Sequence, residues 1–71
     1  MELSIQEKKA IINQYLKTIV SNIYSYNINL IAENSVGSPD QQAIININNA
    51  ILKEEDKKEA LLAEYATLDL E

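Results

Sequence analysis

The 71-residue sequence contains no cysteine, no histidine and no arginine. Without cysteine the chain cannot form disulfides or thiolate metal sites, and nothing in it indicates an oxidising compartment. Without histidine it lacks the commonest general base near neutral pH and the commonest transition-metal ligand. We therefore expect a protein that is not an enzyme and that holds no cofactor and no metal.

Basic residues are scarce as well, since six lysines stand against eleven acidic residues and the net charge is −5. Nucleic-acid binding depends on neutralising phosphates, and membrane-surface binding on a basic polar face, so this acidic chain suits neither. No apolar run approaches the roughly 20 residues that span a bilayer, and the opening MELSIQEKK does not resemble a signal peptide. We expect a cytoplasmic protein with no nucleic-acid partner and no membrane contact.

Glycine and proline occur once each, two positions apart, at Gly37 and Pro39. A glycine of positive φ commonly ends a helix, and proline is tolerated in the first turn of the next one. We therefore expect a turn over residues 35–38, with Ser38 as the N-cap of a second helix and Gln41 as its capping-box partner. A corner this short makes the two helices antiparallel.

Residues 4–34 contain neither glycine nor proline, and their apolar side chains recur at alternating spacings of three and four, with one gap at Lys9. This spacing predicts one helix of about 45 Å that presents a single seam to a partner helix. Ser4 and Glu7 in SIQE predict a capping box at its start. The seam residues are Ile5, Ile12, Leu16, Ile19, Ile23, Tyr26 and Leu30.

Residues 39–68 continue the same spacing and predict the second helix of an all-α antiparallel hairpin. Two positions of this seam carry charge, Glu54 and Lys58. The apolar seam residues are Ile44, Ile47, Ile51, Leu61, Tyr65 and Leu68. A hairpin of strands is a competing interpretation, because YSYNINLI and IININN alternate apolar and polar residues.

The stretch KEEDKKE, residues 53–59, is seven charged residues in a row. One interpretation is a solvated part of a continuous helix, knitted by ion pairs one turn apart. Those pairs would be Glu54–Lys57, Glu54–Lys58 and Glu55–Lys58. The alternative is a break in the helix, with Asp56 capping a third one.

Pairing the two helices from the corner places residues opposite each other when their numbers sum to about 75. Ile19 then lies near Asp56, and the polar residues Thr18, Ser21 and Asn22 face the charged stretch. We expect a polar, loosely packed layer halfway along the hairpin, which fixes the register at some loss of stability.

Both predicted helices carry apolar side chains outside the seam, and a lone hairpin has only one inner face per helix. Each such side chain left exposed forgoes roughly 1.5 to 3 kcal/mol. We therefore expect a homodimer of hairpins forming a four-helix bundle, or a docked helix from another protein. The residues outside the seam are Ile11, Tyr15, Val20, Tyr24, Ile28, Ile31, Ile45, Leu52, Leu62 and Ala66.

The opening MELSIQEKKAIINQ, the corner SPDQQ and the closing ALLAEYATL resemble small helical-hairpin proteins encoded by marine tailed phages, notably those infecting cyanobacteria. The resemblance covers most of the chain and implies a hairpin without catalytic residues. ELSIQEK also resembles the start of the small phycobilisome-degradation adaptors, which are helical hairpins that dimerise. Both resemblances imply action through contact with a host or phage protein.

Two functions are open at this point. The first is a non-enzymatic protein-interaction module, such as an adaptor, an inhibitor or an assembly component. The second is an acidic decoy that mimics nucleic acid and occupies the binding surface of a host protein. Paired carboxylates are the one source of catalytic chemistry in the chain, but bundle metal sites need Glu-x-x-His, so we interpret them as a solvated face.

Overall fold

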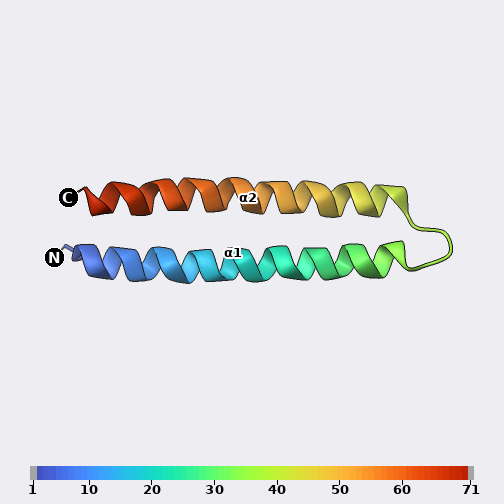
Figure 1. Cartoon of the computed structure of the whole chain (residues 1–71), viewed down its shortest axis with the longest axis horizontal. Helices are drawn as coiled ribbons and strands as arrows, with labels where there is room; N and C mark the ends of the chain where they lie inside the picture. The colour runs from blue at the N-terminus through green and yellow to red at the C-terminus, as the bar shows by residue number, and fades with distance from the viewer. Residues whose placement is uncertain (1, 71) are drawn as a thin grey trace.

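In the computed structural model, which describes residues 2–70, the chain forms two long helices, α1 (Ile5–Asn34) and α2 (Gln41–Asp69). The helices run antiparallel, so the start of α1 and the end of α2 lie together at the end opposite the corner (Figure 1). The hairpin is a rod with extents of 56 × 18 × 14 Å. The described residues contain no strand, so the all-α hairpin is confirmed and the strand alternative is wrong.

The helix α1 begins at the capping box that the sequence predicts. The Ser4 hydroxyl accepts the Glu7 backbone N–H at 3.1 Å, and the Glu7 carboxylate accepts the Ser4 backbone N–H at 3.1 Å. Two donors that a helix start would otherwise leave unpaired are thereby satisfied. The hydrogen bond from the Ser4 backbone lowers the pKa of Glu7 below its ordinary value.

The end of α1 differs from the expectation in one respect. Ser35 is the C-cap, and its N–H reaches the carbonyls of Ile31 and Ala32. Gly37 has no positive φ, and a Cβ added there would meet nothing within 4 Å. The corner therefore does not use the left-handed conformation that only glycine adopts freely, and the predicted role of Gly37 is wrong.

The start of α2 also differs, because its N-cap is Asp40 and not Ser38. The Asp40 carboxylate accepts the backbone N–H groups two and three residues further on, at 3.0 and 3.2 Å. The helix therefore begins at Gln41, two residues later than predicted, and Pro39 precedes it. Aspartate caps as well as serine does, and the backbone N–H of Asp40 is itself held by the Glu33 carboxylate at 2.8 Å.

The seam between α1 and α2 shields few side chains completely. Among the described hydrophobic residues, only Ile12, Ile19 and Leu68 are buried. The other seam residues are half-buried, and they are Ile5, Leu16, Ile23, Tyr26, Leu30, Ile44, Ile47, Ile51, Leu61 and Tyr65. Each helix packs against a single neighbour, so only one stripe of it leaves solvent.

The charged stretch 53–59 lies inside α2, which continues through it without a break. The alternative of a third helix capped by Asp56 is therefore wrong. Of the expected ion pairs, the one between Lys57 and Glu54 is formed, with 3.1 Å between Nζ and Oε1. The two pairs that would involve Lys58 are not formed.

Replacing Asp40 by alanine should lower the free energy of unfolding by about 1 kcal/mol, the usual effect of losing an N-cap. Replacing Ser38 by alanine should change it little, because the Ser38 side chain caps no N–H of α2. Urea unfolding followed by circular dichroism measures both, at one fixed protein concentration because association adds to stability. A larger loss for Ser38→Ala than for Asp40→Ala would contradict the observed start of α2.

Candidate interaction surface

Halfway along the rod, the seam contains a buried carboxylate. Glu54 is 7% exposed, although it belongs to the charged stretch that the sequence analysis interprets as solvated. That interpretation is wrong for this residue, because the spacing of three and four turns position 54 toward α1. Its Oε1 accepts from Lys57 Nζ at 3.1 Å, and its Oε2 accepts from Asn22 Nδ2 at 3.5 Å.

These two partners make the buried carboxylate tolerable. The hydrogen bond from Lys57 lowers the pKa of Glu54 below its ordinary value, burial opposes this effect, and the contact with Asn22 adds to it. Among residues 2–70, no buried side-chain nitrogen or oxygen atom lacks a hydrogen-bond partner. The buried carboxylate in this polar layer is therefore fully paired. A buried polar group without a partner would lower the stability of the fold.

A groove of about 460 Å³ opens beside this layer. The polar residues Thr18 and Asn22 lie at its wall, as expected, whereas Ser21 is exposed. The other lining residues are Tyr15, Ile19, Glu54, Lys57, Ala60 and Leu61. Two helices alone leave this layer loosely filled.

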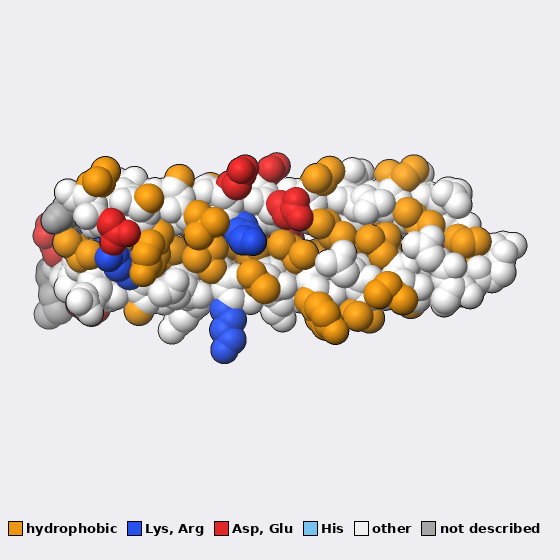
Figure 2. Space-filling model, in the orientation of Figure 1, with side chains coloured by type: hydrophobic (Ala, Val, Ile, Leu, Met, Phe, Trp, Pro, Cys, Tyr) orange, Lys and Arg blue, Asp and Glu red, His pale blue; other side chains and the backbone are white. Residues whose placement is uncertain are grey.

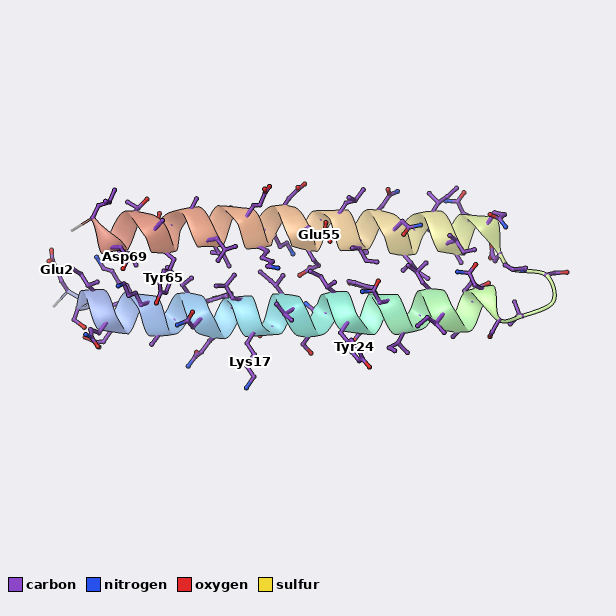
Figure 3. The ribbon with its side chains drawn as sticks, viewed as in Figure 1. Glu2, Lys17, Tyr24, Glu55, Tyr65 and Asp69 are labelled. Atoms are coloured by element: carbon purple, nitrogen blue, oxygen red, sulfur yellow. The ribbon has the colours of Figure 1, made fainter. Side chains whose placement is uncertain are left out.

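A second charged seam position, Lys9, lies near the open end of the rod. Its ammonium pairs with the Asp69 carboxylate and lies 5.3 Å from the centroid of the Tyr65 ring. The hydrogen bond to Asp69 raises the pKa of Lys9 above its ordinary value. Figure 3 shows Tyr65 and Asp69 at this end of α2, where Lys9 ties the two helices together. The gap in the apolar repeat marks Lys9, but the sequence alone does not name its partner.

Outside the seam, large hydrophobic side chains are exposed in greater number than the seam buries. Twelve of them are at least 41% exposed, against three buried hydrophobic residues. The twelve are Leu3, Ile11, Tyr15, Val20, Tyr24, Ile28, Ile31, Val36, Ile45, Leu52, Leu62 and Leu70. The main apolar feature of the single chain is therefore its surface and not its core.

Six of these side chains lie on one side of the hairpin, which we call the apolar face: Val20, Tyr24, Ile31, Ile45, Leu52 and Leu62. Each follows a seam residue by one position, a rotation of about 100° around the helix. Because the two helices are antiparallel, the same rotation brings both sets to the same side. Figure 2 shows this side, with hydrophobic side chains over both helices along most of the rod.

Charge is distributed in the opposite way along the rod. Residues 18–52, the corner half, contain two of the 17 charged side chains, Glu33 and Asp40. The middle and the open end carry the others, and Figure 2 shows their acidic and lysine side chains there. Low charge combined with exposed aromatic and aliphatic side chains is the composition of an interface core.

Comparison of the chain with protein-family models, with curated proteins and with solved structures finds no match. Within residues 2–70, no three His, Cys, Asp or Glu side chains are grouped so that they could hold a metal ion. Neither helix, over its described length, is apolar enough to cross a membrane. Function must therefore be inferred from the exposed surface.

Replacing Glu54 by glutamine should change how stability depends on acid. The folded-state pKa of Glu54 lies below 4.5, so its charged form stabilises the fold above that pH, and the contribution is lost as the pH falls through the folded pKa. The urea midpoints of wild type and Glu54→Gln should therefore differ near pH 6, and the difference should be smaller near pH 3.

Glu64→Gln is the control, because Glu64 is exposed and its side chain makes no hydrogen bond within the described part of the chain. It should follow the wild type at both values of pH. If the gap between wild type and Glu54→Gln were the same near pH 6 and near pH 3, the ion pair would not be the stabilising contact.

Proposed function

We propose that the protein is a small non-enzymatic protein-interaction module that acts as a helical homo-oligomer, with two hairpins forming a four-helix bundle. The observation that carries this proposal is the excess of exposed over buried hydrophobic side chains, twelve against three. Covering each one is worth roughly 1.5 to 3 kcal/mol. A second hairpin carries the same exposed side chains, so in a symmetric dimer each copy covers hydrophobic side chains of the other.

The groove beside Glu54 lies on the side of the rod opposite the apolar face, because Tyr15, Asn22 and Lys57 each precede a seam position. A second copy seated on the apolar face leaves this groove open, so it is available to a helix or an inserted side chain of a further protein. The resemblance to hairpin proteins of marine tailed phages favours a phage setting, in which the module serves as an adaptor, an inhibitor or an assembly component. Its further partner is then a host or phage protein.

The acidic decoy is a second candidate, and one observation favours it. Glu55, Asp56 and Glu59 are exposed in a single stretch of α2, where they form a short anionic surface. Neutralising Glu55 and Asp56 should abolish partner binding by a decoy while leaving self-association intact. An interaction module that uses the apolar face should tolerate the same changes.

Replacing Leu52 on the apolar face by glutamate should separate the oligomer into folded monomers. Two buried carboxylates in a symmetric dimer replace two apolar contacts, so the dissociation constant should rise by about a hundredfold or more. Sedimentation velocity over a dilution series measures the mass, and circular dichroism checks that helix content is kept. A wild type that remains an 8.0 kDa monomer at high concentration would overturn the proposal.

Val36→Glu is the matched control for this experiment. Val36 is 50% exposed, close to the 58% of Leu52, but it lies in the corner and not on the apolar face. It should leave the oligomer intact. Equal loss of association in both variants would mean that general acidity, and not the apolar face, controls the mass.

A further inference from the structure

We propose that two copies meet through their apolar faces with both corners at the same end of the bundle. In this arrangement a two-fold axis runs along the rod, and α1 of each copy packs against α2 of the other. The inference rests on the proposed self-association and adds to it the face, the orientation and the register.

The register follows from the contacts within one hairpin. Asn22 contacts Glu54, so residues at the same height along the rod have numbers that sum to about 76. A two-fold axis along the rod keeps every residue at its height. A residue of α1 therefore lies opposite the residue of the partner's α2 whose number, added to its own, gives about 76.

This register matches the residues along the outer edge of the apolar face pair by pair. The edge residues recur every seven positions on each helix, one after a seam position. The matched pairs are Ala10 with the partner's Ala66, Lys17 with the partner's Glu59, Tyr24 with the partner's Leu52, and Ile31 with the partner's Ile45. In these four pairs small residues meet small ones, opposite charges meet, and large apolar residues meet large apolar ones. The other two members of the apolar face, Val20 and Leu62, lie at the height of the partner's Asp56 and Gln14.

The side chains of this edge point away from the seam of their own hairpin. In Figure 3, Lys17 and Tyr24 leave α1 on the side away from α2. Tyr24 and Ile31 are each 66% exposed, and Lys17 forms no ion pair within the described hairpin. They are therefore free to contact a second copy without any change in the first.

The opposite orientation matches poorly. With corners at opposite ends, a two-fold axis across the rod places α1 on the partner's α1 and α2 on the partner's α2, with heights reversed. Lys17 then faces the partner's Tyr24, and Leu52 faces the partner's Glu59. A charge would lie against a large apolar side chain on both helices, which forgoes the ion pairs and the apolar contacts together.

The face is also large enough for a stable complex. The side of the hairpin that carries it measures 56 by 18 Å, an area of about 1,000 Å² per copy and about 2,000 Å² for the pair. Stable specific interfaces bury roughly 1,200 to 2,000 Å². Coverage of about three fifths of this side therefore reaches the lower limit of that range.

A spin-label measurement tests the orientation directly. The chain has no cysteine, so Ser38→Cys in the exposed corner gives one labelling site per copy. The label-to-label distance in the oligomer should be nearer to the 18 Å width of the hairpin than to its 56 Å length. A distance near the length would overturn this inference but leave self-association standing, whereas a monomer would overturn both.

Charge reversal tests the register. Lys17→Glu and Glu59→Lys should each weaken dimerisation roughly tenfold, because each change creates two like-charge contacts per dimer, and the double variant should recover it. Lys53→Glu is the control, since Lys53 precedes a seam position and lies on the other side of the rod; it should have little effect. A double variant as weak as the single ones would overturn the proposed pairing.

Discussion

A rod of two helices has no interior, and this constraint governs the rest of the structure. Each helix has one neighbour, so it can hide one stripe of side chains and no more. The result is a seam in which three hydrophobic residues are buried and most others remain half-exposed. Helix caps and corner contacts then carry an unusual share of the stability, because so little apolar area is removed from water.

Within this thin seam, charged residues at inward positions are tolerated only where a partner lies opposite. Lys9 meets Asp69 at the open end, and Glu54 meets Lys57 and Asn22 halfway along. A slip of one helical turn between α1 and α2 would separate Asn22 from Glu54 and leave the carboxylate with one partner fewer. The polar layer therefore penalises wrong registers more than it strengthens the correct one.

The alternation of three and four predicted both helices and the inward position of every seam residue, because it reflects the geometry of the helix itself. The same spacing already pointed Glu54 inward, but the composition of KEEDKKE suggested a solvated stretch. At Glu54 the helical spacing, and not the charged composition of the stretch, determined that the side chain is buried. The corner could be located from Gly37 and Pro39, yet its N-cap could not, because Ser38 and Asp40 are equally good caps. The contact between Glu33 and Asp40, across the corner, is visible only in the folded chain.

The separation of charge along the rod is not a by-product of codon usage. All six lysines lie outside residues 18–52, and seven of the eight asparagines lie inside this range. Lysine and asparagine are both encoded by A/T-rich codons, so a bias toward A and T favours the two residues equally and cannot sort them into halves. A difference in the free-energy cost of desolvation between the two side chains can explain why they are separated. An uncharged amide beside an apolar side chain can be covered by another protein at much lower cost than an ammonium group. The corner half thus has the composition of a surface that another protein can cover at low cost, whereas covering the charged half costs more.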